Sequence, residues 1–343
     1  MSARKRIEQS ARVAFERLPD EPRTAARAAF DHVRGIGQVK RNQAILARRL
    51  AALEAEVVNL RDAEASGPPA VADHPTDHRF PNGVSSRICT QEQFAEPWYD
   101  LWCARLDETP KTDRKQWEHA YIARVAEELD LLGPGQRGLG FGVGEEPLVA
   151  YFASRDAEVV ATDLDPNDDG ARVWRNTGQH AAASLDLRRP NVCDDDRFDK
   201  LVSWQPADMR AIPSSLGGFD FCWSSCCFEH LGSLEAGLDF VTHSLDTLHP
   251  GGVAIHTTEF NVTSNDETVE DGPVVLYRRR DLEGLVAKLE TAGHEVAALD
   301  LEPGTGLLDE YADVPPFLDG PHIRLALRGH VTTSVALVIR KAA

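Results

Sequence analysis

The chain has 343 residues, of which 42% are hydrophobic and 27% charged, and its formal net charge is −18. These values are ordinary for a soluble protein and leave room for one large domain with appendages, or for two domains. No run of about 18 apolar residues is present, so we expect no transmembrane segment. The first residues lack the apolar core of a signal peptide, and the six cysteines form no CxxC pair, so we expect a cytoplasmic protein.

The charge is distributed unevenly along the chain. Residues 1–60 contain 12 Lys or Arg and 7 Asp or Glu, so their net charge is +5, and the remaining residues carry −23. A strongly acidic main domain repels phosphate backbones. We therefore expect no nucleic acid among the partners of this protein.

Near the N-terminus, apolar residues repeat with alternating steps of three and four, which predicts an amphipathic helix with a short coiled-coil seam. The seam consists of Ile36, Val39, Gln43, Leu46, Leu50, Leu53, Val57 and Leu60. The single polar position, Gln43, is of the kind that fixes register at a cost in stability. Two interpretations stay open: the helix forms a homodimer through residues 36–60, or it packs on its own domain.

Composition divides the chain into three parts. We expect a helical extension over residues 1–61 and a linker over residues 62–88, where glycine and proline are frequent. Residues 89–343 then form the main domain. It opens with two predicted helices, at residues 91–106 and 112–132.

Four glycines at alternate positions are the most informative feature of the main domain: Gly138, Gly140, Gly142 and Gly144. Their alternation with apolar residues predicts a strand that runs into a turn whose backbone is closely approached. A helix follows from Pro147, and a second strand over residues 157–162 ends at Asp163. A glycine turn, a helix, a strand and an acid about 20 residues on are typical of a nucleotide-binding βαβ unit.

Further strands are predicted in chain order. Residues 218–225 and 248–256 each read as a buried strand, and residues 295–300 and 331–340 as a closing antiparallel pair. Helical segments separate them. The expected fold is an α/β fold of the doubly wound class, with a seven-stranded sheet and helices on both faces.

The glycine spacing resembles motif I of class I S-adenosylmethionine-dependent methyltransferases. Four segments extend the resemblance to bacterial O-methyltransferases associated with glycan and polysaccharide genes: Arg114–Glu118, Gly140–Leu148, Trp223–Leu231 and His256–Asn261. The resemblance implies a Rossmann-like methyltransferase sheet, S-adenosyl-L-methionine as cofactor and a saccharide hydroxyl as acceptor.

The resemblance also assigns the cofactor site. It implies that the backbone around the glycine turn lies against the cofactor, that an acid binds the ribose and that a second acid binds the adenine. The residues so assigned are Gly140, Phe141, Gly142, Gly144, Asp163, Leu164, Asp208 and Met209. The family usually carries an acid two residues before the first glycine of its triplet. Gly138 stands there in this chain, so one usual cofactor contact is missing or is supplied elsewhere.

Two clusters are candidates for catalysis. Glu229 and His230 follow one predicted strand, and His256 and Glu259 follow the next. The carboxyl ends of neighbouring strands meet at one edge of the sheet, where open α/β sheets bind ligands. Methyl transfer to a hydroxyl needs positioning and a base, for which we consider His256, His230 and Glu259.

A divalent-metal site is the alternative for the same residues. Glu229, His230 and His256 offer mixed nitrogen and oxygen ligands. Small-RNA 3′-terminal and ubiquinone-pathway O-methyltransferases bind a divalent ion such as Mg²⁺ through Glu-x-x-Glu-His after the equivalent strand. This chain resembles that motif, with Cys226 in place of the first acid.

Two segments are candidates for acceptor binding. Residues 302–330 and 262–276 contain aromatic, acidic and histidine groups, which suit an oligosaccharide or another small-molecule acceptor. Two other functions stay open. One is O-methylation of a non-sugar small molecule, and the other is a non-catalytic cofactor-binding scaffold.

Overall fold

The computed structural model of the chain describes most of the predicted main domain. The described residues are 39, 42, 43, 80, 81, 83–168, 180, 181, 183–315, 317 and 320–343. Most of the predicted helical extension and linker therefore lies outside the described residues. Among the helices that the structure does describe, none is long and apolar enough to cross a bilayer.

A single large sheet organises the domain, as the sequence predicts. Its strand order is β4-β3-β2-β5-β6-β10-β7, and β9 pairs with β10 beside this path. The strands are β2 (Arg137–Phe141), β3 (Glu158–Asp163), β4 (Val202–Pro206), β5 (Phe219–Ser225), β6 (Leu248–Asn261), β7 (Glu295–Val296), β9 (Leu325–Leu327) and β10 (His330–Arg340). Strands β2 to β6 pair in parallel, whereas β10 runs antiparallel to β6 and β7. The doubly wound α/β class is confirmed.

The closing strand pair is confirmed, with one difference. Strand β7 pairs with the end of β10 in the expected antiparallel sense. The second half of the predicted strand at residues 295–300 is a separate element, β8 (Leu299–Asp300), which pairs in parallel with β1 (Ser86–Arg87). Strand β1 thus connects the start of the domain to its last strands.

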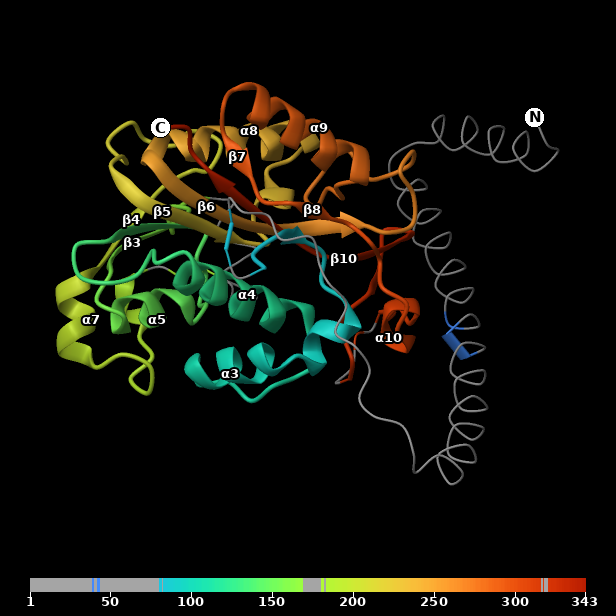
Figure 1. The fold of residues 1–343 in the computed structure, drawn as a ribbon, viewed down its shortest axis with the longest axis horizontal. Coiled ribbons are helices and arrows are strands. Elements are labelled where there is room, and N and C mark those ends of the chain that lie inside the picture. Colours follow the sequence, from blue (N-terminus) through green and yellow to red (C-terminus); the bar gives the residue numbers. More distant parts are fainter. Residues whose placement is uncertain are drawn as a thin grey trace.

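Helices cover both faces of the sheet (Figure 1). On one face lie α8 (Leu234–Ser244) and α9 (Arg279–Thr291), and on the other α3 (Pro97–Arg105), α4 (Arg114–Glu128), α5 (Leu148–Ser154) and α7 (Asp195–Leu201). Short helices complete the chain: η1 (Gln91–Ala95), η2 (Ser184–Leu187), η3 (Phe228–His230), η4 (Leu245–Thr247) and α10 (Leu307–Glu310).

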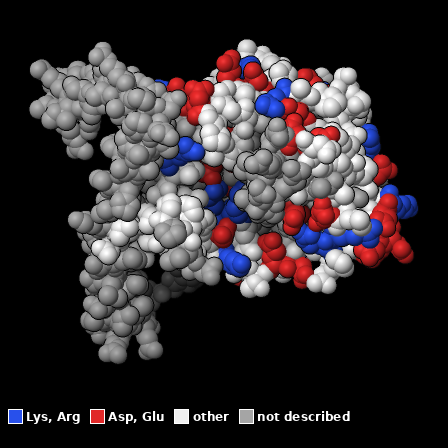
Figure 2. Space-filling model, turned by 180° about the vertical axis from the view of Figure 1, so that it is seen from behind, with Lys and Arg blue, Asp and Glu red and all other residues white. Residues whose placement is uncertain are grey.

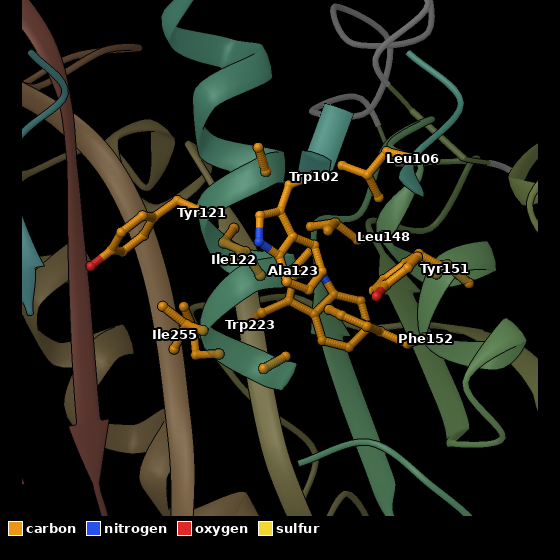
Figure 3. Packing of buried hydrophobic residues seen from close by; sticks show 14 of the residues in the cluster. Trp102, Leu106, Tyr121, Ile122, Ala123, Leu148, Tyr151, Phe152, Trp223 and Ile255 are labelled. Atoms are coloured by element: carbon orange, nitrogen blue, oxygen red, sulfur yellow. The ribbon is translucent and has the colours of Figure 1, made fainter. Parts of the chain in front are cut away.

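Two hydrophobic cores result, one on each face of the sheet. Because side chains alternate along a strand, Trp223 and Ile255 face α4 and α5, whereas Cys222 and Ala254 face α8. Figure 3 shows the α4 side, where Trp223 packs against Phe152 with ring centroids 4.9 Å apart. This alternation decides which polar residues of β5 and β6 can meet α4.

The first two glycines of the alternating series accommodate aromatic rings. Gly138 pairs with Phe221 and Gly140 with Trp223 across the β2–β5 ladder. A Cβ added at Gly138 would lie 2.3 Å from the Phe221 ring, and one added at Gly140 would lie 2.5 Å from the Trp223 ring. The close approach that the sequence predicts is therefore made, at these two positions, by side chains of β5. An acid at position 138 would overlap Phe221.

Charges of both signs are mixed on the described surface. Figure 2 shows acidic and basic side chains next to one another across the face seen from behind. Ion pairs such as Arg188 with Asp195 (3.0 Å) and Arg137 with Glu158 (3.8 Å) belong to this pattern. On the described part of that face no broad basic field is present.

Candidate functional site

The site is built around a glycine turn, which we define as residues Gly142–Glu146 at the carboxyl end of β2. Gly142 and Gly144 have φ of +58° and +49°, in the left-handed region that favours glycine. A Cβ added at Gly142 would lie 2.9 Å from Sγ of Cys227 and 3.5 Å from Sδ of Met209. Met209 therefore lies near the turn.

Asp163, the predicted ribose ligand, lies beside this turn at the end of β3. Its carboxylate accepts hydrogen bonds from the backbone N–H groups of Gly144 (3.1 Å), Leu164 (2.8 Å) and Ala181 (3.3 Å). A carboxylate has about four lone-pair sites, so one acceptor site remains for a ligand hydroxyl. Asp163 thus holds the turn in shape and can still accept one further hydrogen bond.

Asp208, the predicted adenine ligand, is engaged by its own loop. Both carboxylate oxygens accept from the guanidinium of Arg210, at 2.9 to 3.2 Å. Burial alone would raise the pKa of Asp208, but the bonds from Arg210 hold it below the usual value. Binding an adenine amino group would require Asp208 to share or exchange this partner.

A buried ion cluster lies where α4 crosses the ends of β5, β6 and β10. We name it the Arg114 cluster; its members are Arg114, Glu118, Glu259 and Ser334. Arg114 binds Glu118 (3.3 Å), Glu259 and the hydroxyl of Ser334 (2.9 Å). The three charged residues are at most 6% exposed. The cluster attaches the start of α4 to the sheet.

Glu118 accepts hydrogen bonds from hydroxyl groups on β5, β6 and β10. Its carboxylate accepts from Ser225 (3.1 Å), Thr257 (2.8 Å) and Ser334. Burial alone would raise the pKa of Glu118, but the cations Lys115 and Arg114 and these hydroxyls lower it below its usual value. Glu118 is therefore ionised at neutral pH, although it is fully buried.

Lys115 adjoins the Arg114 cluster, and Glu146 is the last residue of the glycine turn. The Lys115 ammonium is 3.8 Å from Glu118, and its side chain is 45% exposed. Oε1 of Glu146 accepts a hydrogen bond of 2.5 Å from the indole N–H of Trp223. Burial raises the pKa of Glu146 to about 8, although the Trp223 bond and the Lys115 charge act in the opposite direction.

His256 does not belong to the site, which corrects the sequence interpretation. Its ring is fully buried on the α8 face, between the hydroxyls of Ser224 (2.9 Å from Nδ1) and Ser244 (3.0 Å from Nε2). Burial lowers its pKa to about 3. Residues three apart on a strand point to opposite faces, so His256 and Glu259 cannot converge. Glu259 faces α4, where Arg114 donates a hydrogen bond to Oε1 of its carboxylate.

Glu229 and His230 do lie at the carboxyl end of β5, on η3. Glu229 is 1% exposed and accepts from the Thr258 hydroxyl at 2.9 Å. Nδ1 of His230 lies 2.8 Å from the carbonyl oxygen of Pro273, and Nε2 lies 3.8 Å from Glu229. Because a carbonyl can only accept, Nδ1 carries the proton, and Nε2 of the neutral ring has the lone pair.

The potential metal ligands differ from the predicted set. Among the described residues, one group could hold an ion: Cys226, Glu229 and Glu259, whose ligand atoms all lie within 4.8 Å of one another. His230 and His256 do not belong to it. Arg114 already pairs with Glu259, and burial raises the pKa of the Cys226 thiol well above its usual value. One protonated thiol and a carboxylate already bound to arginine do not fit Mg²⁺, which prefers oxygen ligands.

Both predicted acceptor segments adjoin the site. In residues 262–276, the backbone N–H of Val275 donates to the carbonyl of Glu229 at 2.9 Å. In residues 302–330, His322 pairs with the start of α4: its carbonyl accepts from the Arg114 N–H at 3.1 Å.

The second of these segments also offers polar and aromatic groups. Nδ1 of His322 lies 2.8 Å from a carboxylate oxygen of Asp313. Phe317, 43% exposed, packs edge-on against the His322 ring.

Sequence reasoning assigned no role to four charged residues of this site: Arg114, Lys115, Glu118 and Glu146. Arg114, Lys115 and Glu118 share one side of α4, at spacings of one, three and four residues. The available signal was that three charges stand in the first two turns of a helix that continues with the apolar run 120–123. Glu146 gave a weaker signal as the second of two acids that follow the glycines.

A surface cavity of about 320 Å³ lies at the other end of α5 from the glycine turn. It is lined by Arg105, Tyr151, Arg155, Cys193 and Arg197, among others. Arg155 and Arg197 are paired with acids there, at 2.6 and 3.5 Å. We place the functional site at the glycine turn instead, because the turn, the strand ends and the buried charges converge there.

No protein-family model matches the chain. Over 85 residues the chain is 31% identical to malonyl-[acyl-carrier protein] O-methyltransferase of Erwinia billingiae (strain Eb661). The match covers 25% of the chain and 32% of that enzyme, so the chain spans about a third of the length of this curated relative. It is a local similarity to an O-methyltransferase.

Solved structures of methyltransferases resemble the fold at low scores. Magnesium protoporphyrin IX methyltransferase from Synechocystis PCC 6803 has a TM-score of 0.40 at 12% identity, covering 74% of this chain and 98% of its own. The CurJ carbon methyltransferase has a TM-score of 0.38 at 15% identity, covering 74% of this chain and 62% of its own. The 1,6-didemethyltoxoflavin-N1-methyltransferase of Burkholderia thailandensis has a TM-score of 0.38 at 14% identity, covering 76% of this chain and 94% of its own. Scores at this level carry no argument about function, and the strand order itself defines the fold.

The burial of His256 leads to a testable pH dependence. Because the pKa of His256 is lowered to about 3, the unfolded chain binds a proton below pH ~6.5 that the folded protein does not. The resulting stability is complete above that pH and is lost as the pH falls towards 3, at up to about 1.4 kcal/mol per pH unit. In urea titrations, the free energies of unfolding of the native chain and His256→Gln should therefore converge between pH 6 and 4. A difference that stays constant over this range would contradict the burial of His256.

Proposed function

We propose that the chain is an S-adenosylmethionine-dependent O-methyltransferase whose acceptor is a saccharide hydroxyl. The observation that carries the proposal is the convergence of the glycine turn with Asp163 and η3 at the carboxyl edge of the sheet. The local similarity to an O-methyltransferase supports the reaction class. The exposed Phe317, beside Asp313 and His322, supports the saccharide, since sugars are bound by aromatic stacking and hydrogen bonds to hydroxyls.

His230 and Glu229 have separate roles in the proposed reaction. When bound, the cofactor supplies an electrophilic methyl group on a sulfonium, which is already a good leaving group. The protein must hold the acceptor hydroxyl in line with that methyl and remove its proton. His230 is the proposed base, because the Pro273 carbonyl leaves the lone pair on Nε2. Glu229, 3.8 Å from that nitrogen, stabilises the imidazolium that forms.

We propose that no divalent cation takes part. The Arg114 guanidinium already neutralises Glu259, and the Cys226 thiol is a poor ligand for Mg²⁺. A metal ion at this site would have to displace Arg114 from the buried Glu259 carboxylate. Breaking such a buried ion pair costs about 3–5 kcal/mol.

Methyl transfer to a panel of mono- and oligosaccharides tests both parts of the proposal. With cofactor bearing an isotope-labelled methyl group, at least one saccharide should gain one methyl by mass spectrometry, at the same rate with and without EDTA. Methylation confined to non-sugar hydroxyls would refute the saccharide. Loss of turnover in EDTA and its recovery with Mg²⁺ would refute the metal-free reaction. Cofactor binding without product from any acceptor would identify a non-catalytic scaffold.

The role of His230 has its own prediction. His230→Gln should lower kcat by roughly 10²- to 10⁴-fold, the usual contribution of a general base, with an unchanged Kd for S-adenosylhomocysteine. His243→Gln, on the exposed side of α8, serves as the matched control and should keep full activity. A near-normal rate in His230→Gln would remove the assignment.

We also propose that the chain forms a homodimer through residues 36–60. The side chain of Asn42 binds the backbone of Ala312 in its own domain, accepting from its N–H at 3.2 Å. The neighbouring seam residues Val39 and Gln43 are exposed and therefore accessible to a second chain. The remaining seam residues lie outside the described part of the chain. Sedimentation equilibrium should give twice the chain mass of 37.7 kDa, and Leu50→Lys should give the single mass. A monomeric native chain would refute the dimer.

A further inference from the structure

The amino-acid end of the proposed cofactor poses a specific problem for this chain. That end carries an α-carboxylate and an α-ammonium, so its recognition requires groups of both charges. An acid at position 138 is excluded, because a Cβ there would lie 2.3 Å from the Phe221 ring. The acid that contacts the ammonium must come from another position around the glycine turn.

Glu146 has the geometry for this role. It is the last residue of the glycine turn, is 7% exposed and is fixed by the 2.5 Å bond from Trp223. That bond uses one of its two oxygens, which leaves lone pairs on the carboxyl group for a further donor. Trp223 is the residue whose ring lies against Gly140. Trp223 in turn stacks on Phe221, the ring that excludes an acid from position 138, with ring centroids 5.8 Å apart.

Lys115 supplies the opposite charge at the same turn. Its ammonium lies 3.8 Å from Oε2 of Glu118, and the same oxygen accepts a hydrogen bond of 3.1 Å from the Ser225 hydroxyl. Sγ of Cys227 lies 3.1 Å from the carbonyl oxygens of both Ser225 and Gly142. These contacts connect the Lys115 ammonium to the turn through the end of β5. The side chain of Lys115 is 45% exposed, whereas Arg114, the neighbouring cation, is buried and bound to Glu118 and Glu259.

We propose that Lys115 and Glu146 bind the amino-acid end of the cofactor. Lys115 binds the α-carboxylate of the cofactor, and Glu146 binds its α-ammonium. This assignment rests on the proposed cofactor. In the free protein, burial keeps the Glu146 carboxyl largely protonated at neutral pH. A cation that arrives beside it favours the ionised form, so the ammonium binds together with the loss of that proton.

Calorimetry with three ligands and two variants tests the assignment. The ligands are S-adenosylhomocysteine, its analogue lacking the carboxylate, and 5′-methylthioadenosine, which lacks the whole amino-acid end. The variants are Lys115→Met and Glu146→Gln, whose amide oxygen can still accept from Trp223. Their matched controls are Lys111→Met and Glu235→Gln, both at exposed positions outside the glycine turn.

Each variant has its own expected pattern. Lys115→Met should weaken the binding of S-adenosylhomocysteine roughly 10- to 100-fold, which is the effect of one lost charge-assisted hydrogen bond. Its affinity for the other two ligands should not change. Glu146→Gln should weaken the binding of both ligands that carry the amino group and should leave the affinity for methylthioadenosine unchanged. Both controls should bind all three ligands as the native chain does.

Two results would overturn the assignment. One is that neither variant changes the affinity for S-adenosylhomocysteine. The other is that a variant weakens methylthioadenosine equally, which indicates a general distortion of the turn. Failure of the proposed function looks different, because the native chain itself would then bind none of the three ligands.

Discussion

The site depends on the buried ion cluster around Arg114. A buried guanidinium and two buried carboxylates are stable only if opposite charges and hydrogen-bonding groups lie close to them. Here Glu118 receives hydroxyl donors from β5, β6 and β10, and Arg114 spans the distance to Glu259. Such a network tolerates little displacement, because any shift of α4 along the sheet would leave a buried charge unpaired.

The position of α4 in turn determines what faces the glycine turn. Lys115 follows Arg114 by one residue, and its ammonium lies 3.8 Å from the Glu118 oxygen that accepts from Ser225 at the carboxyl end of β5. On the same face of the sheet, Phe221 and Trp223 occupy the space above the first two glycines of β2. Packing and charge therefore act together: aromatic rings exclude an acid from β2, and one of the rings holds Glu146 beside the turn.

Much of this architecture could be predicted from the sequence. Alternating apolar residues gave the parallel strands, and the glycine spacing placed Asp163 beside the turn, because these signals are local. The position of His256 follows from a local rule as well. His256 is three residues from Glu259 on one strand, and side chains three apart on a strand point to opposite faces of the sheet. The Arg114 cluster could not be predicted in this way. Arg114 meets Cys226, Glu259 and Ser334 across 112, 145 and 220 residues, and only the folded sheet brings them together.

A crystal structure of the full chain with S-adenosylhomocysteine tests the central claim most directly, namely that the glycine turn, Asp163 and the Arg114 side of α4 form one cofactor site. The account predicts the ribose within hydrogen-bond distance of Asp163, the sulfur near Gly142 and Cys227, and the amino-acid end between Lys115 and Glu146. A ligand bound elsewhere, for instance in the cavity at the far end of α5, or a glycine turn left empty at saturating ligand, would contradict it.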